Sequence, residues 1–175
     1  VYENYLKKIY RKNKGIHTVC AAIGEKDGTT HLYKIGFCNM RWATGSASFE
    51  RENVEKAFTT GMAEEKCKKY NIEMPAESER IIAEEVKVIS PETLLKEYNI
   101  TTIDLLQIDV EGFDFEVVKI FDIEKSQPRA IIFEHSHLSE SDMEECYKLF
   151  EDNHYAYRKY DANTLAMLKP LGDFN

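Results

Sequence analysis

Side chains that could do chemistry gather at two points of the sequence. Asp109 and Glu111 lie two residues apart at the end of the apolar run 103–110, and Glu134, His135 and His137 end a second apolar run. Carboxylates and imidazoles at such positions could bind a divalent metal, act as a general base or hydrogen-bond the polar groups of a cofactor. The simpler interpretation is that Asp109 and Glu111 only cap a following helix.

Two strands are expected to position these groups. Residues 103–110 and 128–134 are apolar and rich in β-branched side chains, which predicts strands buried on both faces. After Gly112, apolar residues recur at helical spacing, with Asp114 in the first turn of the predicted helix. Ligands of open parallel sheets bind in the crevice at the carboxyl ends of the strands. If the two strands are neighbours, about 4.8 Å apart, both polar clusters would face one crevice.

Strand geometry limits the number of metal ligands. On a continuing strand, Glu134 and Ser136 would point away from His135 and His137, which halves the ligands on either face. The sequence therefore predicts no metal site. For the histidines, a role as ordinary surface or hydrogen-bonded residues stays open.

The remaining elements alternate between helices and strands. The patterns predict a helix near the start, strands at 17–24 and 29–35 paired antiparallel, and a polar loop at 37–48 that contains Trp42. Further predictions are one or two exposed helices over 49–70 with Gly61 as a weak point, a strand at 86–89, a helix from Pro91, a helix capped by Ser139 or Ser141, and a hairpin of 155–160 with 163–168. This order predicts an α/β domain whose parallel sheet has an antiparallel edge.

Composition narrows the class of protein. The 175 residues are enough for one domain with a core, and the net charge of -8 argues against binding of nucleic acid or an acidic membrane. No apolar run has the length of a membrane span, and the four scattered cysteines predict reduced thiols in a cytoplasmic protein. The sequence has no Gly-rich phosphate loop and no nucleophile elbow.

The run from Ile103 through Asp109, Val110, Glu111 and Gly112, followed by an acid at Asp114, resembles the signature of FkbM-type methyltransferases. Segments 4–8, 19–28, 44–48, 86–95 and 131–134 resemble other parts of that family in order and spacing, whereas the charged insert from about 51 to 84 does not. The resemblance implies an S-adenosylmethionine-dependent enzyme with a Rossmann-like class I sheet. A single domain over residues 1–175, incomplete at its amino end and with a helical insert at about 49–84, is expected.

Some features depart from the family pattern. Gln107 stands where the family usually has Lys, and Asp114 replaces the usual Glu. The family's first two strands, its Gly-rich cofactor loop and the acid that binds the ribose have no counterpart in these residues. Because an unpaired gap of that size in a sheet is costly, we expect the chain to be the carboxyl-terminal part of a longer protein, or its sheet to be rearranged.

The resemblance implies O-methylation of a hydroxyl group on a small molecule or glycan. It places Asp109 beside the methyl donor, where it could orient the acceptor hydroxyl, and Glu111 in the same loop. Small residues around the adenine would be Cys20, Ala21 and Ala22. Glu134 and Trp42 are expected on the acceptor side, with His135 as a general base if one is used.

Two other functions stay open. The chain could be a catalytically silent module that keeps the fold but not the cofactor site, or a metal-dependent hydrolase using Asp109, Glu111 and Glu134. No nucleic-acid or membrane partner is expected, and the sequence gives no oligomeric state. The identity of the methyl acceptor does not follow from fold.

Overall fold

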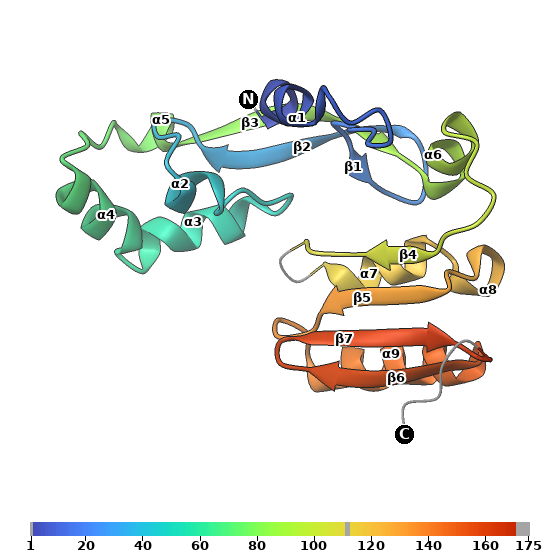
Figure 1. The fold of residues 1–175 in the computed structure, drawn as a ribbon. Coiled ribbons are helices and arrows are strands. Elements are labelled where there is room, and N and C mark those ends of the chain that lie inside the picture. The colour runs from blue at the N-terminus through green and yellow to red at the C-terminus, as the bar shows by residue number, and fades with distance from the viewer. Residues whose placement is uncertain (1, 111–112, 171–175) are drawn as a thin grey trace. The chain divides into compact units, whose positions relative to one another are not determined.

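The computed structural model describes residues 2–110 and 113–170, the first four of them by their backbone only (Figure 1). The chain forms two compact units. Unit 1 consists of Val1–Ala22 with Asp27–Val88, and unit 2 of Ile23–Lys26 with Ile89–Asn175. No helix in the described part of the chain is long and apolar enough to cross a membrane.

Unit 1 contains β2 (Gly28–Ile35) and all but the last residue of β3 (Ile81–Ile89). With the two-residue β1 (Ala22–Ile23) they form a three-stranded sheet in the order β1-β3-β2. β2 and β3 pair antiparallel along their length, from Gly28 opposite Val88 to Ile35 opposite Ile81. The prediction that 29–35 pairs with 17–24 is therefore wrong, because β3 lies between them. β3 is the better partner for β2 because it matches all eight of its residues and adds an ion pair between Lys34 and Glu84.

The helices of unit 1 are α1 (Tyr2–Tyr10), α2 (Arg41–Thr44), α3 (Arg51–Thr59), α4 (Met62–Tyr70) and α5 (Glu77–Arg80). Helices α2 and α3 contact β2, and Ala43 and Val54 pack with Ile35 in a small core. Gly61 separates α3 from α4 with a φ of 77°, a conformation that glycine adopts without strain, so the predicted break is confirmed. The helical insert expected to reach residue 84 ends at Arg80, because the apolar Ile81 and Ile82 begin β3.

Unit 2 contains a four-stranded sheet in the order β4-β5-β7-β6 (Figure 1). Its strands are β4 (Leu105–Gln107), β5 (Ala130–Glu134), β6 (Tyr155–Tyr160) and β7 (Asn163–Leu168). β4 and β5 are parallel, whereas β5–β7 and β6–β7 are antiparallel. The carboxyl-terminal hairpin is confirmed. The expected predominance of parallel strands is not found, since β2–β3 is antiparallel as well.

Three of the four helices described in unit 2 begin where the sequence predicts. The four helices are α6 (Pro91–Glu97), α7 (Asp114–Ile120), α8 (Ile123–Ser126) and α9 (Glu140–Asp152), and the short α8 was not predicted. The Ser90 hydroxyl accepts the Thr93 N–H at 3.2 Å, and the Ser139 hydroxyl accepts the Asp142 N–H at 3.2 Å. Such caps satisfy backbone donors that the first helical turn leaves without partners.

The core of unit 2 lies between one face of this sheet and helices α7 and α9, which Figure 1 shows behind the strands. Ile131 and Phe133 are completely buried there, and the ring centroids of Phe133 and Phe150 are 5.9 Å apart. Burial of each such side chain contributes about 1.5–3 kcal/mol. The opposite face is less covered: Ile132 is half-buried and Leu105 is 50% exposed. The expectation that both strands are buried on both faces is therefore wrong, because both helices pack on the same side.

Candidate functional site

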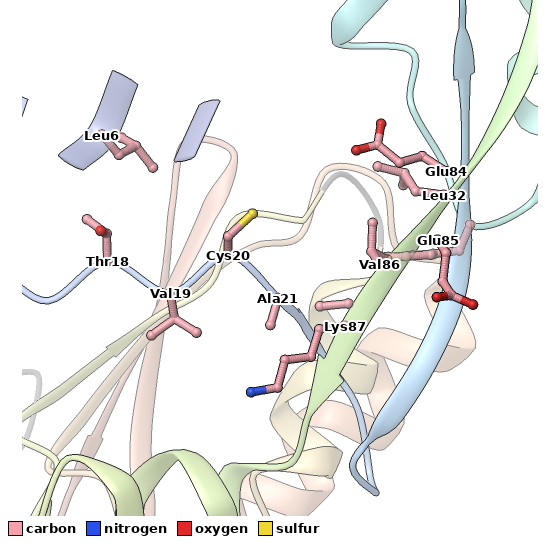
Figure 2. A pocket seen from close by; sticks show the side chains of 12 residues that line it. Leu6, Thr18, Val19, Cys20, Ala21, Leu32, Glu84, Glu85, Val86 and Lys87 are labelled. Carbon is pink, nitrogen blue, oxygen red and sulfur yellow. The ribbon is translucent and has the colours of Figure 1, made fainter. Parts of the chain in front are cut away.

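Unit 1 contains a cavity of about 410 Å³ between the segment from Thr18 to Ala22 and the middle of β3 (Figure 2). Its walls are mostly apolar, with Leu6 from α1, Leu32 from β2 and Val86 from β3. Pockets that bind small molecules usually have volumes of about 300–1,000 Å³ and apolar linings with a few polar groups. The cavity therefore has the size and chemistry of a site for a compact organic ligand.

The three residues predicted to lie around an adenine all line this cavity. Cys20, Ala21 and Ala22 form part of one wall, and Cys20 is exposed as a free thiol. Figure 2 shows Cys20 and Ala21 across the cavity from the β3 residues Glu84 to Lys87. Their small side chains leave room for a flat ring beside the backbone, which is the property that the sequence prediction required.

The charged groups of the cavity come from β3. Glu84, Glu85 and Lys87 line it, and Lys34 forms an ion pair with Glu84. The hydrogen bond and positive charge of Lys34 lower the pKa of Glu84, so this carboxylate stays ionised into mildly acidic solution. Ionised carboxylates accept hydrogen bonds from hydroxyl and amino groups of a ligand. The local sequence pattern does not identify Glu84 and Glu85 as strand residues, because the strand was predicted to begin only at residue 86.

In unit 2 the carboxyl ends of β4 and β5 lie side by side, as the sequence analysis expects of neighbouring strands. The two strands pair from Leu105 opposite Ala130 to Gln107 opposite Ile132, and the Ile108 N–H donates to the Ile132 carbonyl at 2.8 Å. The exposed Asp109 follows directly. Glu111, its predicted companion, lies outside the described residues.

The polar segment after β5 differs from its predicted arrangement. Ser136 donates a hydrogen bond to the Glu134 carboxylate, and His137 Nε2 lies 3.7 Å from the same oxygen. Glu134, Ser136 and His137 therefore come together, instead of alternating across a strand. The reason is that β5 ends at Glu134 and the chain turns before α9.

His135 is held separately from that cluster. Its backbone N–H donates to the Ala162 carbonyl at 2.8 Å, and its ring Nδ1 lies 3.1 Å from the Thr164 hydroxyl oxygen. Thr164 is on β7 and is completely buried. Sequence reasoning missed Thr164, because nothing local in the sequence indicates that β7 inserts beside β5.

A buried carboxylate joins the signature helix to the end of β5. Asp114 is the first residue of α7 and is 0% exposed, and its Oδ1 accepts the Glu134 N–H at 3.2 Å. Asp114 therefore holds the beginning of α7 against the strand that presents Glu134 and His135. Its place in the signature was visible in the sequence, but its contact with β5 was not.

Trp42 lies apart from the cavity-lining residues. It is on α2, half-buried, and packs against the core formed by Ile35 and Ala43. Its Nε1 is buried and has no hydrogen-bond partner among the described residues. Across those same residues, no group of three or more His, Cys, Asp or Glu side chains has a metal-binding arrangement.

Comparison with protein families decides the classification. The model of the methyltransferase FkbM domain matches residues 3–159. The chain belongs to the FkbM methyltransferase family. Neither curated proteins nor solved structures give a significant match. The FkbM match includes the signature around Asp109, the cavity-lining segment 18–22 and the end of β5, and it also extends across the charged insert that sequence analysis set apart.

Proposed function

We propose that this FkbM-family protein transfers a methyl group from S-adenosylmethionine to a hydroxyl oxygen of a small molecule or glycan. The observation that carries the proposal is the family match over residues 3–159, with Asp109 and Glu134 at the ends of two paired parallel strands. Methyl transfer to oxygen requires mainly that the acceptor be held in line with the donor, so carboxylates that orient a hydroxyl are suitable groups.

For the methyl donor, the cavity of unit 1 fits the adenosine part. Cys20, Ala21 and Ala22 would lie against the adenine, while Glu84 and Glu85 would accept hydrogen bonds from hydroxyl or amino groups. The fit rests on the mostly apolar wall and on these two carboxylates. When bound, S-adenosylmethionine supplies an electrophilic methyl group.

For the acceptor, the proposal assigns roles to groups of unit 2. The exposed Asp109 orients the acceptor hydroxyl by accepting its hydrogen bond. Glu111, which lies outside the described residues, stays a proposed catalytic residue on the sequence alone. Glu134 contributes a carboxylate whose position is fixed by Ser136 and His137. Trp42, on α2, stays a proposed substrate-binding residue on the sequence alone.

Calorimetric titration of S-adenosylhomocysteine into the whole chain tests the donor site. We expect binding at micromolar concentration, and loss of at least about tenfold in affinity in Ala21→Phe, where the new ring fills the cavity. The matched control is Ala83→Phe, an exposed alanine of β3 that does not line the cavity. Absence of binding to the unaltered chain would contradict the proposal and favour a silent module.

Formation of S-adenosylhomocysteine from S-adenosylmethionine, with a panel of hydroxylated sugars as acceptors, tests the reaction. Asp109→Ala should abolish turnover while the far-UV circular dichroism spectrum stays unchanged, because Asp109 is exposed and outside the strand. Unchanged turnover in this variant would remove Asp109 from the mechanism. Turnover that chelators abolish would instead favour the metal-dependent alternative.

A further inference from the structure

We infer that Thr164 fixes His135 in the tautomer that carries its proton on Nε2, so that the neutral ring donates a hydrogen bond to the acceptor substrate and does not remove its proton. The substrate part of this inference rests on the proposed methyl transfer. The tautomer part rests only on the contacts of Thr164 and His135.

The backbone places these two side chains together. β5 and β7 pair antiparallel, with Phe133 opposite Thr164 and Glu134 opposite Asn163. The backbone N–H of His135 continues this ladder by donating to the Ala162 carbonyl at 2.8 Å. Because the backbone on both sides is tied, the 3.1 Å contact between Thr164 Oγ1 and His135 Nδ1 belongs to the sheet and not to a free loop.

The protons and acceptors available on the two groups determine the direction of this hydrogen bond. A threonine hydroxyl has one proton to donate, and a neutral imidazole has one nitrogen with a proton and one without. Thr164 is 0% exposed, and among the described residues Nδ1 is the partner that its hydroxyl meets. If Nδ1 carried the proton, the buried hydroxyl would have no acceptor, which is costly. The hydroxyl therefore donates to Nδ1, and the ring proton is on Nε2.

The other ring nitrogen is available to a ligand. His135 is half-buried, and its Nε2 is not a buried nitrogen without a partner among the described residues. The ring contact of His135 with Thr164 uses Nδ1 and leaves Nε2 for a ligand. An N–H at this position suits an oxygen atom of a hydroxylated acceptor. This assignment replaces the general base expected from the sequence with a positioning donor. The exposed Asp109 then accepts the hydrogen bond of the acceptor hydroxyl, and the proton that this hydroxyl loses on methylation passes by way of the carboxylate to solvent.

Nitrogen-15 spectroscopy of the histidine rings in the whole chain tests the tautomer directly. The signals of His135 are assigned by their loss in His135→Asn, and the spectra are recorded at a pH above which they no longer change. We expect a pyridine-like Nδ1 and a pyrrole-like Nε2, with the Nε2–H form in excess by about tenfold. A pyrrole-like Nδ1 would overturn the inference, whatever the activity of the protein.

Two variants separate the hydroxyl from the packing. Thr164→Val keeps the shape of the side chain without a donor, so the tautomer ratio should fall toward that of the exposed His154. Thr164→Ser keeps the hydroxyl and should keep the ratio, and the His137 signals should be the same in both variants. An unchanged ratio in a folded Thr164→Val, or a collapsed ratio in Thr164→Ser, would contradict the role of the hydroxyl.

The role toward substrate is tested with any sugar of the panel that is methylated. Gln at position 135 offers an N–H donor but no basic nitrogen, so His135→Gln should keep kcat/KM within about tenfold, whereas His135→Leu should lose more than about a hundredfold. Equal loss in both variants would show that proton removal, and not donation, is required. If the tautomer is as expected but no acceptor is methylated, the proposed function fails and the assignment of Thr164 stands.

Discussion

Removal of the buried carboxylate of Asp114 should weaken unit 2 as a whole. Its Oδ1 accepts the Glu134 N–H at 3.2 Å in a fully buried position. A hydrogen bond to a charged group contributes about 1.5–3 kcal/mol, and Asp114→Ala removes this acceptor from the Glu134 backbone N–H. We therefore expect Asp114→Ala to lower the free energy of unfolding by about 3 kcal/mol. Asp114→Asn keeps an oxygen at this position and should lose about half as much.

Urea unfolding followed by far-UV circular dichroism measures this loss. The control is Asp104→Ala, which removes an exposed carboxylate 2.9 Å from Arg129 in the same unit. Exposed ion pairs contribute about 0–1 kcal/mol, so the control should unfold nearly like the unaltered protein. If Asp114→Ala and Asp104→Ala have the same effect, the buried carboxylate does not tie α7 to β5, and the reasoning is refuted.

Two further predictions concern buried groups of unit 2. Tyr155→Phe removes the hydroxyl that donates to the Pro128 carbonyl at 2.7 Å and should lower the free energy of unfolding by about 1–2 kcal/mol. The control Tyr160→Phe, at a side chain 73% exposed, should change this free energy by less than about 0.5 kcal/mol. Equal effects of the two substitutions would contradict the prediction. Burial raises the pKa of Cys146 from 9.0 to about 12, so the folded state holds this proton longer than the unfolded chain does. The contribution of this thiol to the free energy of unfolding is therefore fully present below about pH 9 and should be lost as the pH rises toward 12. The free energy of unfolding should fall less with alkaline pH in Cys146→Ala than in the unaltered protein. An equal fall in both proteins would show that Cys146 does not cause it.

Features that depend on neighbouring residues in the chain could be predicted from the sequence. Ser90 and Ser139 begin helices because their hydroxyls accept N–H groups three residues later, a local interaction. The hairpin of β6 and β7 could be predicted because its two strands are joined by a two-residue turn, which is also a local feature. The position of Asp109 at the end of a strand also follows from local patterning.

Features that depend on long-range pairing could not be predicted. Whether 29–35 pairs with 17–24 or with β3 is decided by the match of a strand about fifty residues away, as in the ion pair of Lys34 with Glu84. The contact of Thr164 with His135 requires β7 to insert beside β5, and no residue near either position signals it. Glu84 and Glu85 enter the cavity only because β3 begins earlier than its apolar pattern indicated.

The order of strands in unit 2 has a consequence for the synthesis of the protein. β6 precedes β7 along the chain, yet β7 lies between β5 and β6 in the sheet. During synthesis from the amino end, both β5 and β6 therefore carry an unpaired edge until residues 163–168 have emerged. Exposed strand edges invite pairing with other chains, so a product that stops at residue 162 should aggregate, even though it retains every residue of β4, β5 and β6.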